Sequence, residues 1–536
     1  MSAIKINGKA VEVTPNITVL EAAGKIGVQI PTLCYVKELD PYNSCMVCIV
    51  EDGKSGALIP SCSIPASDVE EVLTDSKKVR DARKAAIELL LSDHVGDCEA
   101  PCRRGCPAFL HIPWMMRLVA ERAYEKAYKT IREHIPIPSI LGRICPAPCE
   151  RACRRRELDA PVSICSIKRF MGDYGLETVT EPSWVQNCYG ERIAVIGAGP
   201  AGLTAAYYLS RGGYRCTVFD SEPLPGGGLR KIDNGGRLPK KILDAEIERI
   251  LEGWVDFQGG VVIGVDRDLA ELAPEFDALI VTTGTVSLDI DESLPAVFQA
   301  RRRQYRSQLA VRAVAEGNRL AKEVVHRLRG FQPGSADSIR ERFDSRAGKL
   351  SREELLSLHN FATGPHGRES CRQAVNPAVE TPSRSEERGL NRDELHVEVN
   401  RCLRCDCAAQ TSCALRSLAE TYGAKQHRFS RLKRNPSSRL TGSGYQGEAI
   451  EYEHGKCIRC GICTRICKQA GESPGLALSG RGIDLHIKAP FDGRIVIADE
   501  AVARRCARMC PTGAFMLHPR YASTAPVRSP VAPEHA

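Results

Sequence analysis

Cysteine is the residue type with the clearest chemistry in this sequence. The chain has 24 cysteines in 536 residues, and most of them fall into tight groups. In a reducing compartment, grouped thiols indicate ligands of metal ions or iron–sulfur clusters rather than disulfides. We find no apolar run long enough for a transmembrane helix and no apolar signal region at the start. We therefore expect a cytoplasmic protein whose cysteines bind clusters.

The first group has the spacing C-x10-C-x2-C-x13-C. Four thiolates are what a [2Fe–2S] cluster needs, and two close and two distant ligands suit a loop folded over it. A zinc site would normally use two C-x2-C knuckles, and this group has one. The surrounding sequence, IPTLCY and CMVCIVEDG, resembles the N-terminal ferredoxin domain of the complex I large iron–sulfur subunit and of iron-only hydrogenases. We predict one [2Fe–2S] cluster on Cys34, Cys45, Cys48 and Cys62.

Two family patterns meet in the second group. IELLLSDHVGDC resembles the same complex I family, in which His-x3-Cys opens a [4Fe–4S] site with one histidine and three cysteines. His94 and Cys98 fit that pattern, but the C-x2-C-x5-C that should follow is missing there. The next segment, from CPAFLHIPW to ICPAPCERAC, resembles instead the N-terminal domain of the glutamate synthase small subunit and of dihydropyrimidine dehydrogenase.

The second resemblance implies two [4Fe–4S] clusters between helices. It assigns one trio of ligands to each cluster: Cys98, Cys102 and Cys153 to one, and Cys106, Cys145 and Cys149 to the other. For the first trio the nearest fourth ligand is His94, since imidazole can replace thiolate at iron; the alternative is an exposed histidine at a helix end. For the second trio it is Cys165 in PVSICSIKRF, which is otherwise a buried thiol.

A glycine-rich turn follows an apolar run near the middle of the chain. ERIAVIGAGPAGLTAAYYLSRGGYRCTVFD predicts a strand, a G-x-G-x-x-G turn on Gly197, Gly199 and Gly202, a helix, and a second strand ending at Asp220. This is the dinucleotide fingerprint: glycines let the backbone approach a pyrophosphate at a helix N-terminus, and the acid binds a ribose hydroxyl. A later G-x-G-x-x-G, at 442–447, lacks the strand and the helix, so we do not expect it to bind.

The segments after this turn favour FAD over NAD. PGGGLRKIDNGGRLPKK and DALIVTTGT resemble the FAD-contacting segments of the glutamate synthase small subunit, which implies FAD contacts for Gly227, Leu229, Arg237 and Gly284. SQLAVRAVAEGNRLAKEV resembles the helix that caps the flavin in that family. There a whole NAD(P)H-binding domain separates the last two segments, whereas about 20 residues do so here. We therefore expect an FAD that takes no hydride from a nucleotide bound by this chain.

Two more cysteine groups lie toward the C-terminus. The first, C-x2-C-x-C-x5-C, can bind a [4Fe–4S] cluster or zinc, and the neighbouring redox modules favour the cluster. Its members are Cys402, Cys405, Cys407 and Cys413. The second contains the bacterial ferredoxin run CIRCGICTRIC, which again resembles the complex I large subunit. We predict a [4Fe–4S] cluster on Cys457, Cys460, Cys463 and Cys510, which leaves Cys467 and Cys506 as remnants of a lost second cluster.

The patterning between these groups indicates a multidomain α/β and α+β chain. Helices are expected around 18–27 and over 76–95. The predicted order is a β-grasp [2Fe–2S] ferredoxin domain (1–75), a helical double-cluster iron–sulfur domain (76–185), a Rossmann-like FAD domain (186–330), a linker (331–400), a Cys-rich segment (401–440), a bacterial ferredoxin-like [4Fe–4S] domain (441–520) and a disordered tail (521–536).

These modules indicate an oxidoreductase subunit that holds FAD, one [2Fe–2S] and three or four [4Fe–4S] clusters. The resemblances imply a hetero-oligomer with an NAD(P)H-oxidising flavoprotein and a formate dehydrogenase, a hydrogenase or a tungsten/molybdenum enzyme. Two alternatives stay open: an autonomous NAD(P)H oxidoreductase or glutamate synthase small subunit, and a scaffold with structural clusters. The net charge of +8 does not indicate nucleic acid, because the basic runs lack interleaved aromatics.

Overall fold

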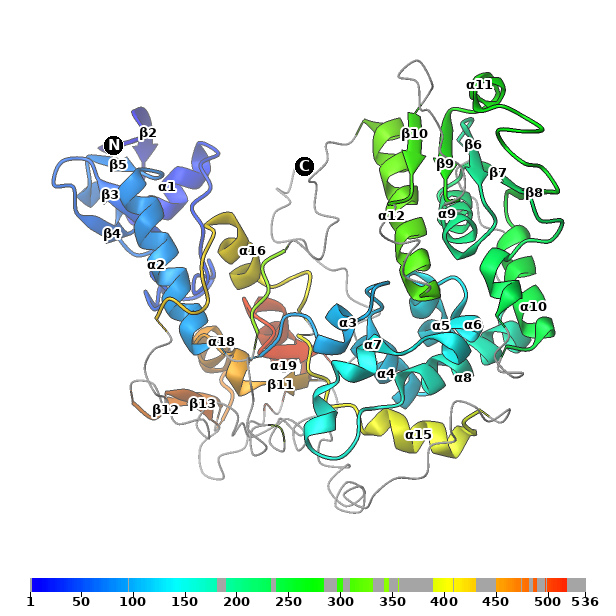
Figure 1. Ribbon diagram of the computed structural model, residues 1–536. Coiled ribbons are helices and arrows are strands. Elements are labelled where there is room, and N and C mark those ends of the chain that lie inside the picture. The colour runs from blue at the N-terminus through cyan, green and yellow to red at the C-terminus, as the bar shows by residue number, and fades with distance from the viewer. Residues whose placement is uncertain are drawn as a thin grey trace. The chain divides into compact units, whose positions relative to one another are not determined.

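The computed structural model divides the chain into two compact units. Unit 1 comprises Met1–Ala100, Glu341–Gln373 and Leu403–Ala536, and unit 2 comprises Pro101–Arg340 and Ala374–Cys402. The residues described here are 2–94, 96–180, 189–232, 238–283, 296–301, 309–330, 342–346, 355, 389–407, 409–429, 450–473, 475–481, 485–488, 497 and 499–517. Figure 1 labels the elements of both units.

Unit 1 begins with a five-stranded sheet in the order β2-β1-β5-β3-β4, the predicted β-grasp. Its elements are β1 (Ser2–Ile6), β2 (Lys9–Val13), α1 (Val19–Lys25), β3 (Ile49–Asp52), β4 (Leu58–Pro60) and β5 (Glu71–Leu73). Alternation in β2 buries Val11 and Val13 and exposes Glu12 between them. Helix α1 starts where predicted, because Thr18 and Glu21 form a reciprocal capping box. The sheet positions the loop that carries the first cysteines.

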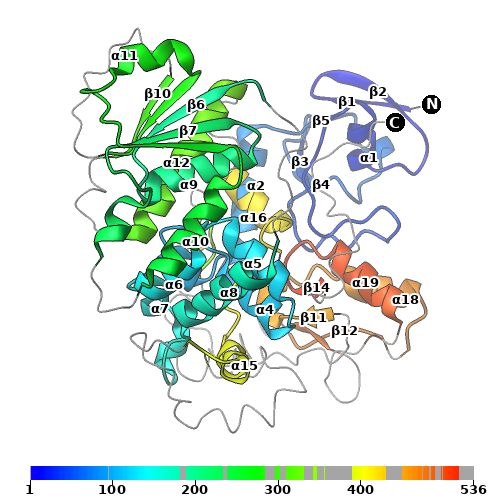
Figure 2. The same cartoon turned by 90° about the vertical axis from the view of Figure 1, so that its right-hand side faces the viewer.

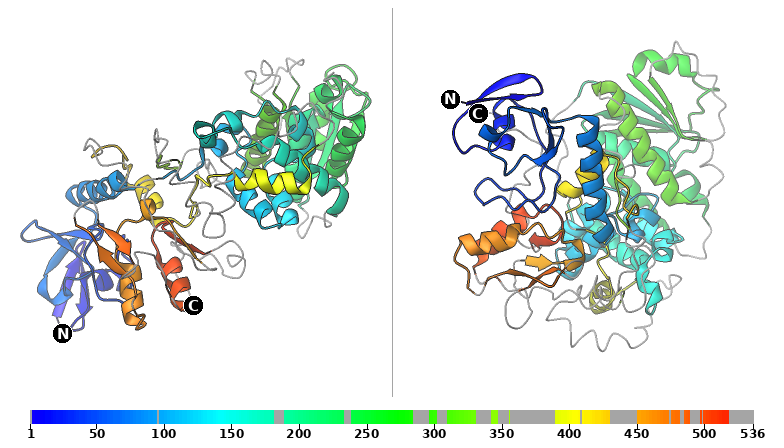
Figure 3. Two further views of the ribbon diagram at one scale, coloured as in Figure 1. Left: turned by 90° about the horizontal axis from the view of Figure 1, so that it is seen from below. Right: turned by 90° about the vertical axis from the view of Figure 1, so that its left-hand side faces the viewer.

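The rest of unit 1 packs around a second core. Its elements are α2 (Lys77–Asp93), α16 (Ala414–Thr421), β11 (Ile450–Tyr452), α18 (Ile462–Gln469), β12 (Ala477–Ser479), β13 (His486–Lys488), α19 (Glu500–Met509) and β14 (Phe515–Leu517). Leu91, Leu415, Ile466 and Phe515 meet in one buried cluster, so α2 shares a core with the C-terminal helices. In Figure 3 the N-terminal elements are blue, and α18 and α19 are orange and red.

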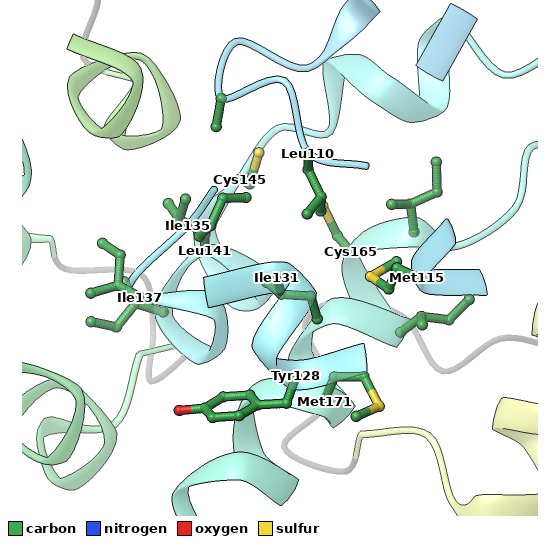
Figure 4. Packing of buried hydrophobic residues seen from close by; sticks show 14 of the residues in the cluster. Leu110, Met115, Tyr128, Ile131, Ile135, Ile137, Leu141, Cys145, Cys165 and Met171 are labelled. Carbon is green, nitrogen blue, oxygen red and sulfur yellow. The ribbon is translucent and has the colours of Figure 1, made fainter. Parts of the chain in front are cut away.

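Unit 2 contains the helical domain that the sequence predicts. Its helices are α3 (Pro101–Gly105), α4 (Ile112–Ala120), α5 (Tyr124–Arg132), α6 (Pro138–Ile144), α7 (Pro148–Arg151), α8 (Ile164–Thr178) and α15 (Arg392–Asn400). Helix α15 lies inside the predicted linker and packs on α4 and α8. Its start is fixed by a capping box between Asn391 and Glu394. Figure 4 shows the core of this domain around Tyr128, Ile131 and Met171.

Glycines bring α6 and α8 unusually close together. A Cβ on Gly142 would lie 2.5 Å from the Arg169 Cα, and one on Gly172 would lie 2.4 Å from the Ser139 nitrogen. Larger side chains at these two positions would therefore push the helices apart. The contact sets the end of α6 beside the start of α8, where two of the predicted cluster ligands lie.

The second part of unit 2 is a parallel sheet in the order β10-β9-β6-β7-β8. Its elements are β6 (Arg192–Ile196), α9 (Pro200–Arg211), β7 (Arg215–Asp220), α10 (Lys240–Leu251), β8 (Val255–Gly259), α11 (Leu269–Leu272), β9 (Ala278–Val281), β10 (Ala296–Gln299) and α12 (Ala310–Arg329). Apolar residues of α9 and α12 cover one face of the sheet, and those of α11 contribute to the other. Figure 2 shows this layered arrangement. The topology is Rossmann-like, as predicted.

Helix α12 is the segment that resembles a flavin-capping helix, and it packs along α9. A Cβ on Gly317 would lie 2.2 Å from the Ala201 carbonyl oxygen, so only glycine permits this approach.

Among the helices that the structure describes, none has the length and apolarity needed to cross a bilayer.

Candidate cofactor sites

The first four cysteines form two thiol pairs at one end of the N-terminal sheet. The Cys48 and Cys62 sulfurs are 3.4 Å apart, and Cys34 and Cys45 hydrogen-bond each other. The hydrogen bond from the partner thiol lowers the pKa of Cys34 to about 5 and that of Cys48 to about 7. All four side chains are buried. Two pairs of thiols, one for each iron, are the donor set that a [2Fe–2S] cluster requires.

The ferredoxin run surrounds an enclosed cavity in unit 1. Its lining includes the four predicted ligands Cys457, Cys460, Cys463 and Cys510, together with apolar side chains such as Phe515. The Cys457 sulfur also accepts a hydrogen bond from the Arg459 amide at 3.4 Å. Thiols that converge on an apolar cavity and accept amide hydrogen bonds suit a [4Fe–4S] cluster, since both features tune its potential.

The two remaining thiols of this module contact each other. Cys467 on α18 and Cys506 on α19 are each 1% exposed and are joined by a side-chain hydrogen bond. That bond lowers the pKa of Cys467. Ala503, one turn before Cys506, has no donor atom, and Glu500 pairs with Arg504. Cys506 also lines the cavity of the ferredoxin run, and the assignment of the pair to a lost second cluster stays a prediction.

Cys98 lies beside Cys407 and Cys413 in unit 1. The Cys407 amide donates a hydrogen bond to the Cys98 carbonyl at 3.3 Å. The thiols of Cys98 and Cys407 are both close enough to Cys413 to interact with it electrostatically. Two sulfurs accept amide hydrogen bonds: Cys98 from Ser345 at 3.3 Å and Cys413 from Arg416 at 3.4 Å. Burial raises the pKa of Cys98 to about 11. Three thiols from segments about 300 residues apart thus converge on one place.

His94 ends α2 next to this group. Its ring is 8% exposed, its Nδ1 atom is buried without a hydrogen-bond partner, and burial lowers the pKa of the imidazole to about 4. The ring lies against Lys456, whose ammonium donates to the Asp406 carbonyl at 2.8 Å and acts on Cys407. The alternative of an exposed histidine is therefore wrong. A neutral, buried imidazole with an unused nitrogen is a suitable iron ligand.

These positions regroup the ligands inferred from the family resemblance. Cys98 was expected with Cys102 and Cys153, but it belongs to unit 1 and contacts Cys407. Of the expected set Cys402, Cys405, Cys407 and Cys413, the first belongs to unit 2 and the other three to unit 1. Cys402 packs against the helical core of unit 2, whereas Cys407 and Cys413 lie in unit 1. The physical reason is that both segments of unit 2, Pro101–Arg340 and Ala374–Cys402, lie between Cys98 and Cys407 in the sequence, so neighbours in sequence at either end need not share a site.

Four thiols meet inside the helical domain of unit 2. Cys145 caps the C-terminus of α6, Cys149 lies in α7, and Cys165 near the start of α8 hydrogen-bonds both of them. Cys106 lies close enough for the charge of Cys145 to act on it. All four are at most 5% exposed, and Figure 4 labels Cys145 and Cys165 in this core. The set matches the predicted trio with Cys165 as its fourth member.

A further trio, Cys102, Cys153 and Cys402, packs on the same helical core in unit 2. Helix α3, which carries Cys102, packs on α7, just before Cys153. The Arg155 guanidinium donates to the Arg401 carbonyl at 3.0 Å and so holds the start of the Cys402 loop. Cys405 belongs to unit 1 and remains a sequence prediction as a ligand. In the described part of the chain, no group of three or more His, Cys, Asp and Glu side chains is placed so that it could hold a single metal ion.

The glycine turn after β6 leaves open space at the N-terminus of α9. A Cβ on Gly202 would lie 1.8 Å from the Gly197 carbonyl oxygen, and Gly197 itself has a φ of +105°. A Cβ on Gly199 would meet no protein atom within 4 Å. Asp220 ends β7, as predicted, and accepts a hydrogen bond from the Ala198 amide at 2.6 Å. Two glycines therefore shape the turn, and the third keeps space for a ligand pyrophosphate.

The predicted FAD loop reaches the same turn. The Gly226 amide donates to the Ala198 carbonyl at 2.9 Å, and a Cβ on Gly227 would lie 3.0 Å from the Gly199 Cα. Leu229 is 3% exposed. Arg237 and Gly284, also predicted as FAD contacts, lie outside the described residues.

Three family models match the chain. They are described as a 2Fe-2S iron–sulfur cluster binding domain (residues 1–77), dihydropyrimidine dehydrogenase domain II with a 4Fe-4S cluster (residues 73–180), and an NAD(P)-binding Rossmann-like domain (residues 195–245). Each match coincides with one of the sites described above.

Several curated proteins are similar over about a third of the chain. The β subunit of NADP(+)-dependent formate dehydrogenase of Moorella thermoacetica is 36% identical over 207 residues, which are 34% of this chain and 29% of that protein. The PreT subunit of NAD-dependent dihydropyrimidine dehydrogenase of Salmonella typhimurium is 34% identical over 204 residues, 38% of this chain and 49% of that protein. The glutamate synthase [NADPH] small chain of Mycobacterium tuberculosis is 34% identical over 197 residues, 36% of this chain and 40% of that protein.

The chain therefore spans less than half the length of each of these relatives. The glutamate synthase and dihydropyrimidine dehydrogenase resemblance seen in the motifs is confirmed. The matches show that this chain combines a 2Fe-2S domain, a 4Fe-4S domain and an NAD(P)-binding Rossmann-like domain.

Proposed function

We propose that this protein is an electron-transfer subunit of an oxidoreductase complex. It relays single electrons among iron–sulfur clusters and exchanges them with a dinucleotide, expected to be FAD, at the glycine turn. The observation that carries this proposal is that one chain combines five groups of buried or half-buried thiols with an open dinucleotide turn. Flavins exchange one or two electrons, so they can connect a two-electron partner to one-electron clusters.

Three groups would hold clusters in unit 1. The [2Fe–2S] cluster would lie on Cys34, Cys45, Cys48 and Cys62. One [4Fe–4S] cluster would lie on Cys457, Cys460, Cys463 and Cys510. Another would lie on His94, Cys98, Cys407 and Cys413, a set supported by the Cys407–Cys98 backbone contact and the unused His94 nitrogen.

Two groups would hold [4Fe–4S] clusters in unit 2. The first is Cys106, Cys145, Cys149 and Cys165, whose thiols contact one another across α6, α7 and α8. The second includes Cys102, Cys153 and Cys402. With the sites of unit 1 this makes four [4Fe–4S] clusters, the upper of the two predicted numbers.

The names of the relatives support the expected partners. Subunits of a formate dehydrogenase and of a dihydropyrimidine dehydrogenase are among them, so we expect a hetero-oligomer with a nucleotide-oxidising flavoprotein or a formate-oxidising enzyme. The cytoplasm is the compartment we expect, since cluster assembly needs reduced thiols.

A second candidate function is supported by one observation. The model that matches residues 195–245 is described as NAD(P)-binding, so the turn is also a candidate nicotinamide nucleotide site. The chain would then oxidise NAD(P)H by itself. We favour the relay because the segment between residues 284 and 307 is too short for a second nucleotide domain.

An anaerobic absorbance titration separates the two functions. The purified chain is first analysed for flavin, iron and acid-labile sulfide, then titrated with NADH, NADPH and dithionite in turn. The relay predicts bleaching of the flavin and cluster bands with dithionite alone. Bleaching by either nucleotide at catalytic rates would establish the autonomous oxidoreductase. A chain purified anaerobically without iron and without flavin would contradict both.

A further inference from the structure

A buried lysine lies among the four thiols of the helical domain. Lys168 is 3% exposed and follows Cys165 by one turn of α8, so both side chains leave the same face of the helix. Its ammonium donates to the Cys165 sulfur at 3.7 Å. The ammonium also interacts electrostatically with the other three thiols of the site, those of Cys145, Cys149 and Cys106.

An environment of thiols is unusual for a buried ammonium. Burying an ammonium is costly unless an opposite charge compensates it. Lys456, the comparable lysine of unit 1, is 1% exposed and is paired with the Glu453 carboxylate. Around Lys168 the groups that act most strongly are sulfurs.

Neutral thiols are weak acceptors and would compensate this charge poorly. Cluster-bound cysteines are thiolates, and they would supply the missing negative charge. Glu150 on α7 accepts a hydrogen bond from the Cys165 amide at 2.8 Å and so is used at the N-terminus of α8. The position of Lys168 therefore makes physical sense when Cys106, Cys145 and Cys149 are ligands.

We infer that Lys168 is a positioning residue that places a fixed positive charge beside this [4Fe–4S] site and raises its reduction potential. The inference rests on the proposed function, since it needs the four cysteines to hold a cluster. One-electron reduction adds one negative charge to the site and breaks no bond. The electron comes from the redox partner or, in a titration, from dithionite. A nearby positive charge favours the more negative state, and low dielectric strengthens this effect.

A consequence for electron flow follows from the fixed charge. The site around Lys168 would be easier to reduce than a similar four-cysteine site without such a charge. Electrons that enter unit 2 would then collect at this site before they move on. Lys168 would therefore help to set the order in which the clusters fill.

The test compares midpoint potentials of charge variants in the full-length chain. Lys168→Met removes the charge at similar volume, Lys168→Leu is a second neutral variant, and Lys168→Arg keeps the charge. Lys129→Met, at an exposed position on α5, is the matched control. Cys145→Ala identifies which electron paramagnetic resonance signal belongs to this site. Each protein is analysed for iron and titrated electrochemically under argon.

We expect Lys168→Met to retain the wild-type iron content and to shift this one signal to a more negative midpoint potential. Lys168→Arg and Lys129→Met should stay close to the wild type. An unchanged potential in an iron-replete Lys168→Met would overturn the inference. If both neutral variants lost about four iron atoms and Lys168→Arg did not, Lys168 would serve cluster assembly, and the tuning role would be wrong. Absence of any Cys145-dependent signal in the wild type would instead contradict the proposed cluster.

Discussion

Removal of cysteines in pairs gives the sharpest test of the ligand sets. The perturbation is Cys98→Ala, Cys102→Ala and Cys407→Ala, alone and in the two combinations that include Cys98. Alanine is used because a serine oxygen can still bind iron. The amide-to-carbonyl hydrogen bond that joins Cys407 to Cys98 at 3.3 Å involves backbone atoms, so it can survive these substitutions. Cys216→Ala is the control, since this thiol is 1% exposed within β7 and outside every proposed site.

The expected magnitudes follow from the proposed sites. One [2Fe–2S] and four [4Fe–4S] clusters correspond to about 18 iron atoms per chain. Each single variant should lose about four iron atoms. Cys98→Ala with Cys407→Ala should lose no more than either alone, because both thiols serve one cluster. Cys98→Ala with Cys102→Ala should lose about eight, because these thiols serve different clusters.

The assay is iron and acid-labile sulfide per chain after anaerobic purification, with electron paramagnetic resonance of the reduced protein to show which signal disappears. The grouping inferred from sequence resemblance gives the opposite ranking. If Cys98→Ala with Cys102→Ala lost about four iron atoms and Cys98→Ala with Cys407→Ala lost about eight, our reasoning from the tertiary contacts would be refuted. Loss of iron in Cys216→Ala would show that the assay reports general instability.

Three further results are expected. Gly199→Val should abolish dinucleotide binding but leave the iron content and the melting temperature normal, since a Cβ at this position meets no protein atom. Gly202→Val should instead destabilise the fold by at least about 1–3 kcal/mol. Flavin that stays bound in Gly199→Val would contradict the proposed site. Burial raises the pKa of Glu246 to about 7 from 4.5, so its contribution to stability is complete below pH 4.5 and is lost as the pH rises through 7, by at most about 3 kcal/mol. Melting temperatures between pH 5.5 and 8 should fall less steeply in Glu246→Gln, and parallel curves would disprove this. Replacement of Cys467 and Cys506 by alanine should leave the iron content unchanged, and a loss of about four iron atoms would reveal a second cluster there.

Local signals in the sequence predicted most of the elements. The Thr18 capping box fixes the start of α1, and the apolar run before Gly197 becomes β6. Helix α15, inside the segment predicted as a linker with some helix, also has a local signal, the capping box at Asn391. The close contact of α6 with α8 was missed, because Gly142 and Gly172 read as ordinary helix glycines until their opposing atoms are known.

The sequence by itself determined the sites whose ligands lie close together in the chain. Short spacings limit the positions that such thiols can take relative to one another. Cys457, Cys460 and Cys463 therefore have few arrangements other than around one cavity. The glycine turn is likewise a local matter, since a steric limit on two neighbouring residues decides it.

Only the tertiary structure decided which distant segments complete a site. Cys98 is four residues from Cys102 in sequence, yet it contacts Cys407 across the inserted unit. The cost of closing a loop rises only slowly with its length, so sequence separation places little constraint on which thiols meet. Packing decides it instead: His94 and Cys98 follow α2, whose apolar face joins the same core as Cys413, and a backbone hydrogen bond joins Cys407 to Cys98.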